Sequence, residues 1–301
     1  MVKRVVSVSL GSSKRNHQVE IDVLGERFII ERLGTDGDMK AMVKMIRDLD
    51  GKVDAFGLGG MDLFIFAGTR RYILRDALKV ASAAQVTPLV DGSGLKNTLE
   101  RRVINYLREN TDLLSSQVRV LMVCAMDRFG MAQALVESGC KLILGDFVFV
   151  LGLPLPLYSL KSLEILARLA VPIVRNFPFE YLYPTGKKQE ETTPRYGKYF
   201  HSADIIAGDF HFIRRYMPSR LEGKSIITNT VTSDDVELLK EKGVKYLVTT
   251  TPELKGRSFG TNVMEAMLVA VSGKKEELTS DEYNSLLSKI DFKPRVELLN
   301  K

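Results

Sequence analysis

The stretch that decides the fold is VRVLMVCAMDRFGMAQALVESGCKLILGD, residues 118–146. It opens with the apolar run Val118–Cys124, which is typical of a strand buried on both faces of a parallel sheet. A short turn follows, then a helix that stops at Gly139, then a second strand over Lys141–Gly145. A strand, a turn, a helix and a strand in this order predict a Rossmann-like, nucleotide-binding unit.

The turn of this unit departs from the phosphate-binding pattern G-x-G-x-x-G. It runs from Ala125 to Gly130 and keeps only the third glycine, which allows close packing of helix and strand. The second glycine lets the backbone approach a pyrophosphate, and Asp127 in its place would repel that ligand. Asp146 ends the second strand about 20 residues after the turn, where such a unit keeps its ribose-binding acid. A nucleotide bound here would be held in an unusual way.

Length and composition indicate a two-domain globular protein. The chain has 301 residues, of which 45% are hydrophobic and 27% charged, and its formal net charge is +6. No basic run interleaved with aromatic residues occurs, so the charge favours a small anionic ligand over nucleic acid. Cys124 and Cys140 lie in apolar runs and are interpreted as buried free thiols in a reducing compartment. Without a signal-peptide pattern or an apolar run of about 18 residues, the sequence predicts a cytoplasmic protein that does not use a membrane.

The first third of the chain predicts an α/β domain with an antiparallel hairpin corner. Three short strands are expected over 4–10, 19–24 and 27–33, and their short connections require two or three of them to pair antiparallel. Residues 35–38 should cap the helix that follows. The later elements are a helix over 39–49, a strand over 53–58, a helix over 70–84, a strand over 87–90 and a helix over 97–109.

The rest of the chain predicts a parallel sheet completed by later strands. The elements expected beyond residue 146 are strands at 171–174, 203–207, 225–229 and 245–249, a loop over 148–157, a long excursion over 176–200, and helices after Ser159, after Ser233, within 256–272 and after Thr279. The fold class is therefore α/β with two domains. An N-terminal α/β domain, 1–112, would bind a substrate, and a C-terminal Rossmann-like parallel sheet, 113–275, is followed by a helical tail, 276–301.

A polar, glycine-rich loop between the two predicted domains is the first candidate site. Asp91, Ser93 and Lys96 place a carboxylate, a hydroxyl and an ammonium within a few residues, at the kind of boundary where small-molecule clefts lie. A lysine beside an aspartate can hold and release a proton when burial and pairing tune its pKa. The alternative is a plain helix start in which Asn97 or Thr98 is the cap and Lys96 is solvated.

Two further features place polar groups at the ends of strands or helices. Gly145-Asp146-Phe147 recurs as Gly208-Asp209-Phe210, each time after an apolar strand. Both carboxylates should then lie at the ligand-binding edge of an open α/β sheet, unless Gly-Asp merely makes a turn. Near the end of the chain, Gly256–Asn262 opens a helix whose free N–H groups, with Arg257, could bind a carboxylate or a phosphate; an ordinary capped helix is the alternative. The scattered histidines and cysteines predict no metal site.

Short motifs of the later chain stand in a recognisable order. An Asp-Gly loop and a helix precede the Rossmann strand, and further motif residues are Asn229-Thr230, Thr251-Pro252-Glu253-Leu254, Gly260, Met264 and Gly273. From about residue 91 onward this order resembles the shikimate/quinate dehydrogenase family, as found in bacterial proteins labelled quinate 5-dehydrogenase, with Glu265 in the place of a family glutamine. The resemblance implies NAD(P)-linked oxidation of a cyclic polyol acid, with a lysine and an aspartate handling the hydroxyl proton.

The first hypothesis is an NAD(P)-dependent dehydrogenase that oxidises a hydroxylated cyclic carboxylic acid of the quinate or shikimate type. Lys96 and Asp91 would be its catalytic pair, and Asp146 on the adenosine ribose would favour NAD over NADP. The residues expected to bind the cofactor are Ala125, Asp127, Arg128, Phe129, Gly130, Asp146, Asn229 and Thr230. Those expected to bind the substrate are Ser93, Asn97, Thr251, Arg257 and Gly260.

The second hypothesis is a non-catalytic or regulatory protein that binds a small metabolite on a Rossmann-like scaffold and has no pyrophosphate grip, since a fold does not dictate a chemistry. The carboxylates of Asp127, Asp146 and Asp209 would then contact a cation, a cationic ligand or a polyol. Under both hypotheses the partner is a small molecule, neither nucleic acid nor a membrane is expected, and the chain is compatible with a homodimer.

Overall fold

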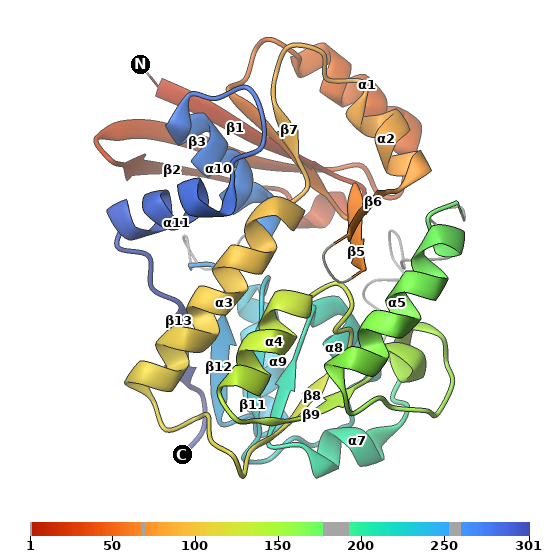
Figure 1. Cartoon of the computed structure of the whole chain (residues 1–301). Helices are drawn as coiled ribbons and strands as arrows, with labels where there is room; N and C mark the ends of the chain where they lie inside the picture. The colour runs from red at the N-terminus through yellow and green to blue at the C-terminus, as the bar shows by residue number, and fades with distance from the viewer. Residues whose placement is uncertain (1, 68–69, 177–192, 253–259) are drawn as a thin grey trace.

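The computed structural model describes residues 2–67, 70–176, 193–252 and 260–301. Within them the chain forms one sheet from its N-terminal third and another from the remainder, with the long helix α3 (Ser93–Asn110) running between them (Figure 1). Helices pack on both sheets, so the architecture is α/β with two units of parallel sheet. The fold class predicted from the sequence is confirmed.

The first sheet has the strand order β2-β3-β1-β4-β7. Its strands are β1 (Val2–Ser9), β2 (His17–Val23), β3 (Glu26–Gly34), β4 (Ala55–Gly59) and β7 (Leu89–Val90). β2 and β3 form the predicted antiparallel hairpin, whereas β1 pairs parallel with β3 and β4. The chain reverses twice between β1 and β3, so these two strands run in the same direction. The other elements of this third are η1 (Ser13–Arg15), α1 (Met39–Leu49), α2 (Arg75–Ala81) and a separate hairpin of β5 (Phe64–Ala67) and β6 (Arg70–Ile73).

The second sheet has the strand order β13-β12-β11-β10-β8-β9, and all neighbours are parallel except β12 and β13. Its strands are β8 (Arg119–Met122), β9 (Lys141–Leu144), β10 (Ile205–Ala207), β11 (Ser225–Thr228), β12 (Tyr246–Thr249) and β13 (Arg295–Leu298). The helices are α4 (Phe129–Glu137), η2 (Asp146–Val150), α5 (Leu160–Val174), α7 (Gly197–Ser202), α8 (Phe210–Tyr216), α9 (Ser233–Glu241), α10 (Thr261–Ser272) and α11 (Ser280–Lys289). The unit β8–α4–β9 is the strand–turn–helix–strand predicted at 118–146.

One apolar core joins the two sheets through α3 and α10. It extends from Val5 of β1 over Leu99 of α3 and Met267 of α10 to Val120 of β8, and all four side chains are buried. α10 comes late in the chain but packs against β1 and β4, so the chain returns to cover the first sheet before β13 joins the second. None of the helices in the described parts of the chain combines the length and apolarity that a bilayer span requires.

Three local expectations differ from the structure. Residues 171–174 are the last turn of α5 and not a strand, because Leu163, Ala167 and Val171 are buried at intervals of four and keep the helical period. Residues 70–84 are not one helix, because β6 pairs with β5 and α2 begins only at Arg75. The tail expected to be helical contains α11 and then the strand β13. Most of the excursion expected over 176–200 falls on 177–192, outside the described residues.

Candidate functional site

A polar cleft lies where the carboxyl ends of the two sheets face each other. β1, β4 and β7 of the first sheet and β8, β10 and β11 of the second all lead to this cavity, whose volume is about 170 Å³. Each set of three strands is parallel, so the residues that follow them converge at one edge. Residues far apart in the sequence therefore line one cavity, among them Ser9, Asp62, Asp91, Asp127, Asp209 and Asn229.

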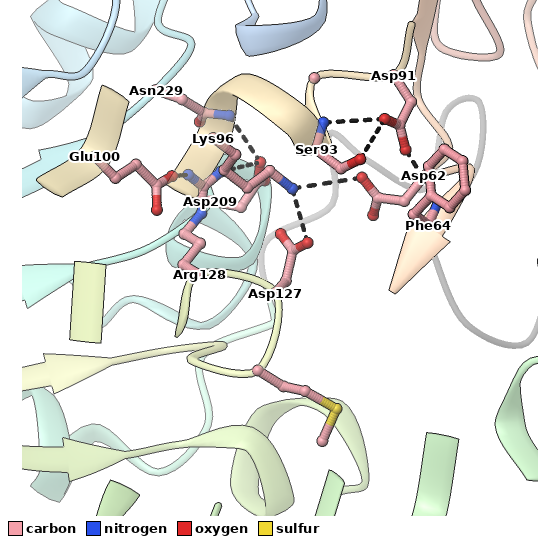
Figure 2. Close-up of polar contacts among 12 residues, drawn as sticks. Asp62, Phe64, Asp91, Ser93, Lys96, Glu100, Asp127, Arg128, Asp209 and Asn229 are labelled. Carbon is pink, nitrogen blue, oxygen red and sulfur yellow. Dashed lines mark hydrogen bonds and ion pairs between the residues drawn. The ribbon is translucent and has the colours of Figure 1, made fainter. Parts of the chain in front are cut away.

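Lys96 of α3 lies between acids from the two sheets (Figure 2). Its Nζ is 2.7 Å from a carboxylate oxygen of Asp127, which follows β8, and 3.5 Å from one of Asp62, which follows β4. Burial alone would lower the pKa of Lys96, but the attraction of the two carboxylates outweighs burial and raises the pKa above its ordinary value. Lys96 is therefore a cation and a hydrogen-bond donor at neutral pH, and not a base.

A second buried ion-pair cluster begins one helical turn further along α3. Glu100 contacts the guanidinium of Arg128, and the two side chains are 0% and 2% exposed. Arg128 also lies 3.4 Å from Asp209, which accepts a hydrogen bond of 3.2 Å from Asn229 (Figure 2). Burial raises the pKa of Glu100 to about 7, although Arg128 opposes this. One oxygen of Glu100 and Nε of Arg128 have no hydrogen-bond partner in the described chain, so the hydrogen-bonding capacity of the cluster is not filled by the described residues.

Two arginines from the first sheet border the same cleft. Arg15 of η1 donates a hydrogen bond of 2.9 Å to Nε2 of His211 on α8, and Arg32 of β3 donates one of 3.0 Å to the hydroxyl of Ser9. Burial, and then the charge of Arg15, lowers the pKa of His211 to about 4, so this histidine is neutral at physiological pH. Guanidinium groups and carboxylates therefore both border the cleft, and together they suit a ligand with an anionic end and hydroxyl groups.

The turn after β8 is filled by the chain itself. Asp146 at the end of β9 is 4% exposed, and its carboxylate accepts hydrogen bonds from the backbone N–H groups of Ala125, at 3.0 Å, and Met126, at 2.8 Å. Burial raises the pKa of Asp146 to about 6 in spite of these bonds. Asp127, in the place of the second glycine, is held by Lys96. In a Rossmann-like unit the backbone N–H groups of this turn and of the helix start bind a pyrophosphate. Here two of those N–H groups are bonded to Asp146 and a carboxylate stands at the position of the second glycine, so the turn does not fit a pyrophosphate in that position.

Asp91, the expected partner of Lys96, is engaged by the backbone instead. Its carboxylate accepts hydrogen bonds from the N–H groups of Leu63, at 2.6 Å, and Phe64, at 3.0 Å (Figure 2). It also accepts from the N–H and the hydroxyl of Ser93, at 3.0 and 2.6 Å. Asp91 thus ties the segment after β4 to the start of α3, and the lysine pairs with other acids.

The start of α3 decides between the two interpretations of this loop. The helix begins at Ser93 with Gly92 as its cap, so Lys96 lies in the first turn and is 9% exposed. The alternative, in which Asn97 or Thr98 caps the helix and Lys96 is solvated, is wrong. Asn97 instead lies beside Gly130 of α4, where a Cβ would collide with it.

The other predicted site residues divide between two cavities and the core. Asn229, Thr230 and Gly260 line the cleft. A second cavity of about 580 Å³, beside the first residues of α4, is lined by Ser93, Asn97, Phe129 and Gly130 and shares Lys96, Asp127 and Arg128 with the cleft. Thr251 is fully buried and donates a hydrogen bond of 3.2 Å to the carbonyl of Asn229. Arg257 lies outside the described residues.

Several cleft residues were not among the predicted site residues: Ser7, Ser9, Arg15, Arg32, Asp62 and His211. Glu100, which lines the adjoining cavity and contacts Arg128, was not predicted either. Thr261 and Asn262 line the cleft and belong to the helix start over 256–262 that the sequence offered as an anion site. Glu100 had a usable signal, because it stands four residues after Lys96 and so shares its helix face. The others come from β1, η1, β3, the segment after β4, and α8, and no single sequence pattern joins them. In the described parts of the chain, no three His, Cys, Asp or Glu side chains are placed to hold a metal ion.

The chain belongs to the family described as Domain of unknown function (DUF8754), whose profile matches residues 94–299. Residues 4–91 match a second profile, Domain of unknown function (DUF8753), so the two matches meet at the start of α3. A search of curated proteins gives no match.

Solved structures of two kinds are similar to this chain. A galactofuranose binding protein is 13% identical, with a TM-score of 0.38 over 96% of this chain and 98% of that chain. Glutamate dehydrogenase from Thermus thermophilus is 10% identical, with a TM-score of 0.45 over 96% and 73%. L-tryptophan dehydrogenase from Nostoc punctiforme is 12% identical, with a TM-score of 0.35 over 89% and 68%. Likenesses this weak add nothing to what the strand order establishes, which is a Rossmann-like scaffold with a ligand-sized cleft.

Proposed function

We propose that the cleft binds a small hydroxylated carboxylic acid. The observation that carries the proposal is the ammonium of Lys96 held between Asp62 and Asp127 on the cleft wall. Three charges brought together with little water cost desolvation energy, and perturbed groups of this kind gather at functional sites. Hydroxyl groups of a ligand can donate to the two carboxylates and accept from the ammonium.

The size of the cleft limits the ligand. A dry cavity of about 150 Å³ in another protein accommodates benzene, so the 170 Å³ found here suits a single ring or a short chain. A dinucleotide is several times larger. Because the carboxylates of Asp62, Asp127 and Asp209 are balanced by Lys96, Arg128 and the arginines of the first sheet, a ligand of low net charge with many hydroxyl groups is favoured over a polyanion.

The test is a thermal-shift screen followed by calorimetry. The panel consists of the hydroxy acids quinate, L-threonate and D-gluconate, the neutral polyols threitol and sorbitol, and the dinucleotides NAD and NADP. We expect at least one hydroxy acid to stabilise the wild type, and Lys96→Met to abolish that stabilisation while Lys44→Met, at an exposed ion pair, preserves it. If none of the hydroxy acids binds at millimolar concentration, the proposal is refuted.

An NAD-linked dehydrogenase of the quinate/shikimate type is the second candidate. It is favoured by the cavity of about 580 Å³ beside the first residues of α4, because a Rossmann-like unit holds its dinucleotide next to that helix. The cavity shares Lys96, Asp127 and Arg128 with the cleft, so a ligand in one would adjoin a ligand in the other. The turn itself does not fit a pyrophosphate in the usual way, so this candidate depends on direct binding data. Calorimetric binding of NAD in preference to NADP would support it, and binding of neither at millimolar concentration removes it.

A further inference from the structure

α10 begins in the wall of the cleft, and its start has the properties of an anion site. The helix has 12 residues, and Gly260, Thr261 and Asn262 line the cavity. Its cap, Gly260, provides no side-chain acceptor, and no acid stands in its first turn. A helix start of this kind presents free N–H groups and a partial positive charge to whatever lies in front of it.

Thr261 provides an independent observation. Its side chain is 5% exposed, and its hydroxyl has no hydrogen-bond partner within the described chain. Buried hydroxyl groups are nearly always paired, because an unpaired one loses its bonds to water and gains none. Because Thr261 lines the cleft, a ligand in the cavity can supply the partner that its hydroxyl lacks.

The start of α10 is fixed by close packing against the first sheet. A Cβ on Gly92 would lie 2.7 Å from the backbone nitrogen of Asn262, and one on Gly57 would lie 2.9 Å from its carbonyl oxygen. Asn262 also donates a hydrogen bond of 2.7 Å from Nδ2 to the hydroxyl of Ser7. The helix start therefore keeps one position relative to β1 and β4, as a preformed binding site requires.

The charges around the cleft favour one orientation of a bound ligand. Asp62 and Asp127 flank Lys96, and Asp209 lies beside Arg128, so a carboxylate placed there would meet like charge. The first turn of α10 has no acid. Hydroxyl groups suit the acidic part of the wall, because they can donate to carboxylates, and an anion suits the helix start.

We propose that the start of α10, with the hydroxyl of Thr261 as a donor, binds the carboxylate of the ligand, while Lys96 and its two acids bind the ligand's hydroxyl groups. This assignment rests on the proposed function and deepens it. It predicts that the cleft distinguishes a hydroxy acid from the polyol of the same shape, and that the difference is located at α10.

The test compares Thr261→Val with Thr250→Val. Both changes remove a buried hydroxyl without a partner in the described chain and keep the side-chain shape, but Thr250 does not line the cleft. Calorimetry uses two matched ligand pairs, L-threonate with threitol and D-gluconate with sorbitol. We expect Thr261→Val to weaken hydroxy-acid binding about tenfold and to leave polyol binding within about twofold, since one charge-assisted hydrogen bond is lost. Thr250→Val should change neither.

Asn262→Asp is a second variant that does not depend on the threonine. It adds a negative charge in the first turn of α10 with almost no change in shape, which favours the helix and repels a bound carboxylate. The Nδ2 donor to Ser7 is lost, but the Ser7 hydroxyl can donate to the new carboxylate in its place. We expect acid binding to fall at least about tenfold and polyol binding to persist. Equal binding of acid and polyol by the wild type, or equal effects of Thr261→Val and Thr250→Val, would overturn the subsite and leave the proposed function standing. If the wild type binds neither acid of these pairs, the subsite falls, and if it also fails to bind quinate, the proposed function falls with it.

Discussion

Replacing Lys96 by methionine tests whether the buried trio of Lys96, Asp62 and Asp127 is an electrostatic centre of the fold. The ammonium lies 2.7 and 3.5 Å from the two carboxylates, and its side chain is 11% exposed. At an effective dielectric constant of about 20, these separations correspond to gross attractions of about 6 and about 5 kcal/mol. Desolvation of the three groups offsets most of that sum. We therefore expect a net loss of about 3 kcal/mol, because the variant leaves two carboxylates without their cation.

The assay is urea unfolding followed by circular dichroism, with the slope of the transition used to verify that the variant unfolds as the wild type does. Lys44→Met is the matched control, since Lys44 and Asp48 form an ion pair on α1 whose side chains are 77% and 57% exposed. Its expected cost is below about 0.5 kcal/mol. If the two variants lose the same free energy of unfolding, the trio is no more than a surface ion pair and the reasoning fails.

The pH dependence of this loss has a definite sign. The pKa of Lys96 is raised, so its stabilisation is fully present below the ordinary value of 10.5 and is lost only as the pH rises through the higher folded value. The stability difference between wild type and Lys96→Met should therefore not shrink between about pH 6 and about pH 9. A difference that disappears by about pH 9 would mean that the lysine is neutral in the folded protein.

Three other variants have defined outcomes. Burial and then Asp91 raise the pKa of Glu265 to about 8, so the contribution of Glu265 to wild-type stability should fall as the pH rises from about 4.5 to about 8. Glu265→Gln should lack this fall, and parallel urea titrations of the two proteins across that range would contradict the assignment. Gly130→Ala places a Cβ against Asn97 of α3 and should cost about 2 kcal/mol, whereas Gly197→Ala, where the nearest atom is 3.7 Å away, should cost nothing; equal unfolding midpoints would refute the packing role. Burial lowers the pKa of His211 to about 4, so wild-type stability should rise with pH between about 4 and about 6.5 on its account, and His211→Gln should flatten this part of the profile. An unchanged profile would show that the fold does not lower the pKa of His211.

The parts of the fold that could be predicted have signals contained within one short segment. The β8–α4–β9 unit shows an apolar strand, a turn, a helix period and a stop within 118–146, and the hairpin of β2 and β3 follows from a connection too short for anything else. The misassigned segments depend on distant partners. The segment 171–174 is rich in β-branched residues, but Val171 continues the buried face of α5, and Phe64–Ala67 becomes a strand only by pairing with β6.

The sequence predicted where the site lies, but not which side chains pair with one another there. Lys96 was identified from a polar loop at a domain boundary, and the structure places it in the cleft. Asp91 looked like a partner for Lys96 because the two residues are close in sequence. The carboxylate of Asp91 instead accepts hydrogen bonds from the backbone N–H groups of Leu63 and Phe64. The acids that do pair with Lys96 follow β4 and β8, so only the arrangement of two sheets brings them within reach.

The repeated Gly-Asp motif shows why the order of strands matters for function. Asp146 and Asp209 each follow a buried strand of the second sheet, but β9 lies at the edge of that sheet, whereas β10 lies on the other side of β8. The chain therefore changes direction across the sheet at β8, and a crevice opens between β8 and β10, where open α/β sheets bind their ligands. Asp209 and Asp127 border this crevice, while Asp146 lies outside it and bonds the turn of β8. The same three-residue sequence thus places one carboxylate at the cleft and the other against the turn after β8, because strand order is a property of the whole sheet.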